Sequence, residues 1–152
     1  MPDHRVRNCQ SACRACGELR PEPDLGPQYG VFVGRTPDHA YTYFDSFAPV
    51  ADAFFASIKQ LPEYSAMAES ERPARVQHAA GLVLIDPSPS GERYSLIDFA
   101  RCEQCGGTTR TLSSVPESAP HEWTMMPEAT FTDWCRMPVD GREALIRKAL
   151  ST

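Results

Sequence analysis

Two short segments carry the residues best suited to chemistry, "CRACG" at residues 13–17 and "CEQCG" at residues 102–106. Each reads Cys-x-x-Cys-Gly, and we call them the first and second Cys turns. Two thiolates spaced in this way can converge on one cation, while the following glycine allows a positive φ. One turn supplies two ligands, but structural zinc takes four in a closed tetrahedron. We therefore predict one structural zinc ion held by Cys13, Cys16, Cys102 and Cys105.

The choice of ligands on the N-terminal side is not unique, because "CQSACRAC" also offers Cys9. We favour Cys13 and Cys16, since only this pair is followed by a glycine, and leave Cys9 as an alternative ligand. A Cys-x-x-Cys pair can also be a redox centre or two free thiols. Neither Cys turn opens a helix after a strand, as a thioredoxin-like redox pair does, so the metal interpretation is preferred.

The predicted zinc is structural, because a catalytic zinc keeps one coordination position open and four cysteines leave none. The zinc deaminase pattern is absent, since Arg101 rather than proline precedes Cys102 and no histidine has glutamate two residues later. Cys135 could act as a nucleophile with His78 or His121 as its base, but a cysteine beside a tryptophan is more often a core residue. We expect a protein that is not an enzyme; an enzyme of unrecognised type stays an alternative.

Composition indicates one ordinary globular domain over residues 1–152, with 41% hydrophobic and 23% charged residues. No apolar run is long enough to span a bilayer and no secretory signal is visible, so we expect no membrane partner and a cytoplasmic location. The net charge of −5 argues against nucleic acid as the partner. A nucleic-acid-binding zinc ribbon remains an alternative, because four arginines lie near the Cys turns: Arg14, Arg20, Arg101 and Arg110.

The elements that must position these cysteines are short, and together they indicate an α+β fold. We expect an antiparallel sheet of hairpins with a zinc-ribbon-like module of four cysteines, one central helix and one C-terminal helix. Residues 1–28 are expected to form a loop, with a further short helical piece at residues 63–71 and one or two helical turns within residues 121–138. Predicted strands cover residues 29–33, 40–44, 75–85, 94–100 and 108–115, and predicted helices cover 46–61 and 140–150 with Asp140 as N-cap.

The Cys turns resemble the knuckles of a zinc ribbon, through Cys13, Cys16, Gly17, Cys102, Cys105 and Gly106. The long insertion between them departs from the common ribbon. The paired layout also resembles the double-CXXCG motif family, although this chain is short for that family. Its members include proteins assigned as bacterial immunity proteins against contact-dependent toxins. The resemblance implies a protein that binds and neutralises one cognate toxin.

An acidic immunity protein would suit a basic toxin, because opposite charges steer two proteins together. We therefore expect a protein partner to contact acidic residues of the chain, with Trp123 as a hydrophobic anchor. The segment from His121 to Trp134 is rich in aromatic and methionine side chains, which either join this surface or close the core over the zinc module. The acidic candidates for partner binding are Asp45, Asp52, Glu63, Glu69 and Glu71.

Overall fold

Antiparallel sheets and helices make up the chain, which confirms the predicted α+β class. The computed structural model describes residues 4–23, 30–97, 101–111 and 123–152, and only the backbone of residues 4–9, 20–23, 111 and 123–125. The chain divides into two compact units. Unit 1 comprises Met1–Tyr29 and Ile97–Pro127, and unit 2 comprises Gly30–Leu96 and Glu128–Thr152. That residues 1–152 fold as a single domain stays a prediction.

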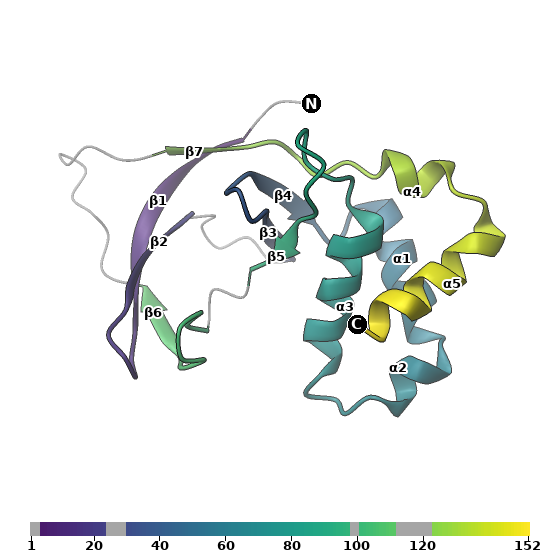
Figure 1. Cartoon of the computed structure of the whole chain (residues 1–152), viewed down its shortest axis with the longest axis horizontal. Coiled ribbons are helices and arrows are strands. Elements are labelled where there is room, and N and C mark those ends of the chain that lie inside the picture. The colour runs from purple at the N-terminus through teal and green to yellow at the C-terminus, as the bar shows by residue number, and fades with distance from the viewer. Residues whose placement is uncertain (1–3, 24–29, 98–100, 112–122) are drawn as a thin grey trace. The chain divides into compact units, whose positions relative to one another are not determined.

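Unit 1 is built on one long strand, β1 (His4–Cys13), which pairs antiparallel with three others (Figure 1). β7 (Trp123–Met126) pairs with its beginning, and β2 (Leu19–Pro23) and β6 (Thr109–Thr111) pair with its end. The loop predicted over residues 1–28 is therefore wrong for residues 4–13 and 19–23, and residues 1–3 and 24–28 lie outside the described residues. The polar sequence of β1 lacks the alternation of a half-buried strand, and its strand conformation depends on backbone pairing with distant segments.

The strands predicted on either side of the second Cys turn are confirmed in part. The returning strand is present as β6, and residues 112–115 lie outside the described residues. The strand predicted at residues 94–100 is present only as β5 (Ser95–Leu96), which belongs to unit 2, and residues 98–100 are not described.

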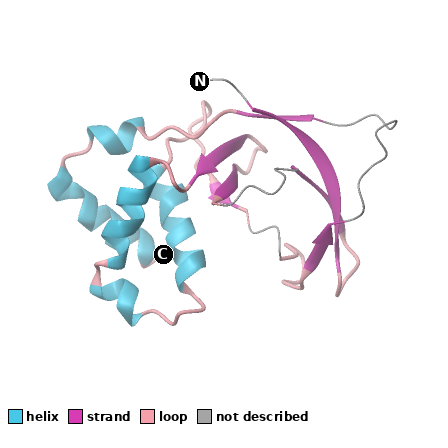
Figure 2. Cartoon of the chain, turned by 180° about the vertical axis from the view of Figure 1, so that it is seen from behind, coloured by secondary structure: helices cyan, strands magenta, loops and turns pink. Residues whose placement is uncertain are grey.

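Unit 2 begins with the predicted hairpin, formed by β3 (Val31–Arg35) and β4 (Tyr41–Asp45). β5 pairs with the other edge of β3 and completes a three-stranded sheet in the order β4-β3-β5. The helices of the described chain all belong to this unit (Figure 2). They are α1 (Pro49–Lys59), α2 (Pro62–Ala66), α3 (Arg72–Ala79), α4 (Thr132–Arg136) and α5 (Val139–Leu150).

The predicted central and C-terminal helices are confirmed as α1 and α5, but the cap of α5 is not the predicted one. Pro138 occupies the N-cap position, and no side chain caps the helix there. Asp140 lies inside the first turn, where its charge still favours the helix dipole. The helix therefore begins two residues earlier than the capping motif suggests.

The strand predicted at residues 75–85 is wrong, because this segment continues α3 into a π-helical turn, η1 (Ala80–Leu84). A short apolar run can be a buried strand or a buried helix, and tertiary packing decides between them. Ala80 and Leu84 are fully buried here. Gly81 is no strand bulge: a Cβ at this position would lie 2.2 Å from the carbonyl oxygen of Tyr94.

The hydrophobic core of unit 2 lies between α1, the α3–η1 segment, α4, α5 and the inner face of the hairpin. The rings of Phe54 and Trp134 meet edge to face, with centroids 5.2 Å apart at 83°. Trp134 thus joins the core of unit 2, whereas the cysteine cluster that the aromatic segment was expected to cover belongs to unit 1. Within the part of the chain that is described, no helix has both the length and the apolar character needed to cross a membrane. The largest fully buried members of this core are Phe44, Phe54, Ile58, Leu84 and Ile85.

Candidate metal centre

The two Cys turns have the same backbone structure. In the first, the N–H of Gly17 donates to the carbonyl of Cys13 at 3.0 Å, and in the second Gly106 donates to Cys102 at 2.9 Å. Both glycines have positive φ, 76° and 75°. Glycine adopts this conformation without the strain that a Cβ would cause, which is why each turn ends in glycine. The predicted knuckles are therefore present at residues 13–17 and 102–106.

Pairing of strands brings the two turns together. The first turn lies at the tip of the β1–β2 hairpin, and an antiparallel bridge between Arg101 and Thr108 closes the second. β6 follows that bridge and pairs directly with the end of β1, where Cys13 lies opposite Thr109. The N–H of Arg14 also donates to the carbonyl of Thr108 at 2.8 Å. The ladder between β1 and β6 thus sets the distance between the turns.

The four predicted ligands form one cluster. The sulfur atoms of Cys13, Cys16, Cys102 and Cys105 all lie within 4.8 Å of one another. The closest pairs join the two turns: Cys13 Sγ lies 3.5 Å from Cys105 Sγ, and Cys16 Sγ lies 3.6 Å from Cys102 Sγ. A tetrahedral zinc with sulfur at about 2.3 Å has edges of about 3.8 Å, so the cluster fits such an ion. All four are free thiols with no disulfide.

Backbone amides prepare the sulfurs for negative charge. The N–H groups of Ala15 and Cys16 donate to Cys13 Sγ at 3.3 and 3.4 Å, and Gly107 donates to Cys105 Sγ at 3.4 Å. The hydrogen bond from the Cys16 amide is the largest influence on Cys13. Together with the bonds from the Ala15 amide and from the thiols of Cys105 and Cys16, it lowers the pKa of Cys13 to about 6, against the effect of burial.

Cys16, the other thiol of the first turn, is made harder to ionise by the neighbouring sulfur atoms. The backbone N–H of Glu18 lowers the pKa of Cys16, but Cys13, burial, Cys105 and Cys102 raise it to about 12. Without a cation, Cys16 is therefore harder to ionise than an ordinary thiol. A divalent metal ion would remove that penalty by binding the thiolates.

Gly107 is a residue of this site that the motif alone does not identify. A Cβ at this position would lie 2.9 Å from Ala15 Cβ, 3.1 Å from Cys13 Sγ and 3.2 Å from Cys105 Sγ. Glycine is therefore needed where the second turn passes the first. The signal in the sequence is the doubled glycine of "CEQCGG", which the first turn does not repeat.

The remaining cysteines are Cys135, which is not part of the cluster, and Cys9, whose side chain is not described. Cys135 is exposed and free, so the expectation of a buried core cysteine is wrong; its neighbour Trp134 takes the buried position on α4. His78, one of the two bases considered for it, lies on α3 and its Nε2 bonds Thr152 Oγ1 at 3.2 Å. His121 and the side chain of Cys9 lie outside the described residues.

The acidic residues expected to contact a partner are distributed over unit 2, and two of them are tied to the fold. Glu63 pairs with Arg147 at 2.9 Å. Asp45 accepts a hydrogen bond from the N–H of Phe47 at 2.9 Å in the turn after β4. Asp52 and Glu71 are exposed, and Glu69, also exposed, lies 4.0 Å from Arg72. Trp123 is in β7, but its side chain is not described.

Asp52 and Glu69 both line an open hollow of about 520 Å³ in unit 2, which we call the Phe47 groove. Phe47 is 60% exposed, and its ring packs so closely on Gly30 that a Cβ there would lie 2.1 Å away. The ring is thereby held at the surface. The groove is lined by Phe32, Ser46, Phe47, Asp52, Phe55, Lys59, Tyr64, Glu69, Arg72, Pro73, Val76 and Gln77.

Comparison with known proteins does not assign the chain to a family. No family model, no curated protein and no solved structure matches the chain. What the chain itself establishes is a four-cysteine cluster suited to a metal ion, carried by two hairpin-like turns as in a zinc ribbon.

Proposed function

We propose that this protein is a non-catalytic, zinc-stabilised protein-binding module. The observation that carries the proposal is the closed set of four sulfurs within 4.8 Å of one another. Thiolate ligands in a tetrahedral arrangement favour zinc over the hard cations magnesium and calcium. Four protein ligands leave no position for substrate or water, so the metal contributes to folding and not to a reaction.

The Phe47 groove supports the part of the proposal that concerns binding. Four aromatic side chains, Phe32, Phe47, Phe55 and Tyr64, line it, and aromatic side chains are enriched where proteins recognise one another. Asp52 and Glu69 place carboxylates at the same hollow. Arg72 also lines the hollow, but its guanidinium donates to the carbonyl oxygens of Tyr64 and Ser65 at 3.1 and 3.2 Å. Part of the positive charge near the two carboxylates is therefore already bound within the chain.

In its most specific form, the proposal is an immunity protein that neutralises a basic bacterial toxin in the cytoplasm. The resemblance of the Cys turns to the double-CXXCG motif family supports this form. The net charge of −5 also supports it, because an acidic protein attracts a basic partner over a distance. The chain would act by covering the toxin surface.

A two-protein binding assay tests the proposal. The partner is first captured from the source cell and then purified, and its binding is compared between the native chain and Phe47→Ser. Tight binding of a basic protein that Phe47→Ser weakens at least tenfold would support the proposal. Recovery of short nucleic acids with a steep salt dependence would overturn it and favour the nucleic-acid alternative, for which the exposed Arg14 and Arg110 are the candidates.

A further inference from the structure

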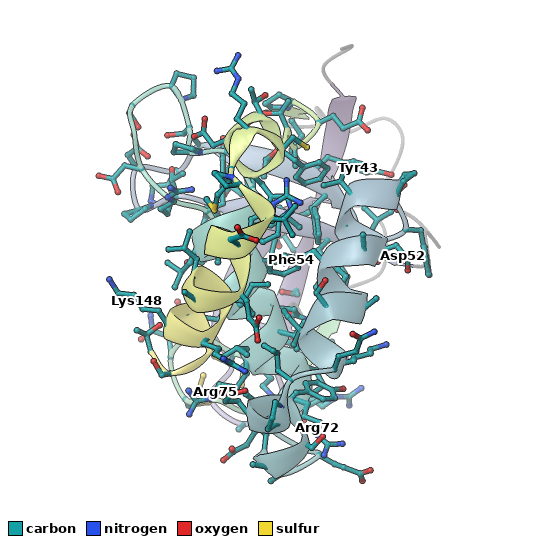
Figure 3. The ribbon with its side chains drawn as sticks, turned by 90° about the vertical axis from the view of Figure 1, so that its right-hand side faces the viewer. Tyr43, Asp52, Phe54, Arg72, Arg75 and Lys148 are labelled. Atoms are coloured by element: carbon teal, nitrogen blue, oxygen red, sulfur yellow. The ribbon has the colours of Figure 1, made fainter. Side chains whose placement is uncertain are left out.

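A second cavity of unit 2, of about 390 Å³, lies between α1 and α5. Figure 3 shows these two helices side by side, with the labelled Phe54 between them. Three buried side chains, Leu61, Trp134 and Ile146, give the cavity an apolar floor. Its volume falls within the usual range for sites that bind small molecules, about 300–1,000 Å³. The remaining lining residues are Ala53, Ser57, Gln60, Val139, Arg142 and Glu143.

Arg142 presents a fixed positive charge to this cavity. Its guanidinium carbon lies 5.0 Å from the centre of the Trp134 ring, and Nη2 donates to the carbonyl oxygens of Trp134 at 3.1 Å and Cys135 at 3.4 Å. Nε is buried and has no hydrogen-bond partner in the structure. A buried donor without a partner is uncommon in native proteins and calls for an acceptor.

No carboxylate of the described chain compensates that charge. Glu143 lines the same cavity, but it pairs with Arg147 at 2.9 Å, and Arg147 also binds Glu63 at 2.9 Å. The cavity also reaches Val139, the first residue of α5, where no side chain caps the helix. The partial positive charge of a helix N-terminus favours an anion at this end.

We propose that this cavity binds a small organic carboxylate with an aromatic or aliphatic body. The body would occupy the space above Leu61, Trp134 and Ile146, and the carboxylate would neutralise Arg142. Arginine suits this role because its planar guanidinium presents paired N–H donors to a carboxylate. The site is independent of the cysteine cluster and of the Phe47 groove, so it goes beyond the proposed protein-binding function.

The test uses benzoate as the probe and the full chain with its metal. Arginine Nε–H groups give their own signals in ¹H–¹⁵N spectra, and the Arg142 signal is assigned by its loss in Arg142→Met. We expect benzoate to shift that signal saturably and the neutral analogue benzyl alcohol to bind at least tenfold more weakly. Equal binding of the two probes, or no saturable shift with benzoate, would overturn the proposal.

Variants locate the binding and separate it from folding. Arg142→Met should weaken benzoate binding at least tenfold, whereas Arg136→Met, at an exposed position on α4 that does not line the cavity, should leave it unchanged. Ser57→Leu fills the cavity from an exposed position on α1 and keeps Arg142 in place. It should also abolish binding, and undiminished affinity in Ser57→Leu would overturn the proposal even if Arg142→Met fails to fold.

Discussion

Cys13 and Cys105 are 92 positions apart in the chain, and their sulfur atoms lie 3.5 Å apart. The contact joins the tip of the β1–β2 hairpin to the turn that precedes β6. Because such a site cannot form in an unfolded chain, the free energy of metal binding becomes free energy of folding. We therefore expect the stability of unit 1 to depend on a bound metal ion.

We predict one tightly held zinc ion per chain. Four thiolates that can surround one ion tetrahedrally bind zinc tightly, so the zinc should remain bound during purification without added metal. Elemental analysis should find close to one equivalent, and chelation should lower the melting temperature. Purified protein without metal, in which all six thiols titrate freely, would contradict this prediction.

Replacing a ligand should harm folding more than replacing another cysteine. Cys102→Ser leaves the metal with three sulfur ligands and weakens the link between the two turns. Cys135→Ser changes an exposed thiol outside the cluster and is the matched control. Cys9→Ser tests the alternative ligand. Thermal melts should show a large loss for Cys102→Ser alone, and comparable melts for all three variants would mean that the ligands are misassigned.

Gly107→Ala should weaken the metal site although it removes no ligand. The added methyl would lie 3.1 Å from Cys13 Sγ and 3.2 Å from Cys105 Sγ, so the sulfurs must move apart. Crowding of this kind costs about 1–3 kcal/mol. Competition with a zinc chelator measures the loss of affinity. Gly141→Ala is the control, because nothing lies within 4 Å of its Cβ position in α5. An unchanged zinc affinity in Gly107→Ala would show that the turns can relax.

The cysteine cluster could be predicted from the sequence because two turns with a specific spacing and a following glycine indicate the same chemistry twice. The sequence does not show that the two turns have matching hydrogen bonds, or that Gly107 is needed between them. Those features depend on the approach of segments far apart in the chain. The hairpin β3–β4 and helix α1 could be predicted because their periodicity is local and strong.

The failures share a cause, which is that tertiary contacts decided the local structure. The run at residues 75–85 is apolar enough for either a strand or a helix. Gly81 passes the backbone of Tyr94 so closely that a side chain would not fit, and only the tertiary structure reveals this contact. β1 is polar and carries no strand pattern, yet it pairs with three strands of unit 1. Nothing local distinguishes Glu63 from Asp52, and only the fold reveals that Glu63 is paired with Arg147.

Acid should loosen the start of α4 through Asp86. Partial burial raises the pKa of this carboxylate, but hydrogen bonds from Thr130 Oγ1 and from the N–H groups of Asp133 and Thr132 lower it more, so the pKa lies below its ordinary value. Its stabilising effect is therefore complete above the unfolded pKa of about 3.9 and disappears as the pH falls through the folded pKa.

The variant Asp86→Asn should lower the free energy of unfolding at pH 7 by about 1 kcal/mol, as expected for a lost capping carboxylate. The difference in stability between the two proteins should shrink as the pH falls from about 4 towards the lower pKa of the folded state, because Asp86 of the native protein is then protonated and uncharged, as Asn is. Urea melts from about pH 2.5 to 7 measure it. Glu92→Gln also removes a carboxylate charge, from an exposed position outside the helices, and is the control. A constant difference between native and Asp86→Asn across this range would contradict the assignment.

The last prediction concerns the acidic residues at the Phe47 groove. If a basic protein binds there, added salt should slow association by tenfold or more and change dissociation much less, because charge acts mainly on encounter. The double variant Asp52→Lys with Glu69→Lys should reproduce that slowing at low salt. Both residues are exposed, but Asp52 lies in the first turn of α1, so the free energy of unfolding should fall by no more than about 1–2 kcal/mol. The double variant Glu92→Lys with Asp140→Lys, which makes the same change of charge at exposed positions that do not line the groove, is the control in stopped-flow binding. If both variants slow association equally, the net charge and not this groove would direct the encounter.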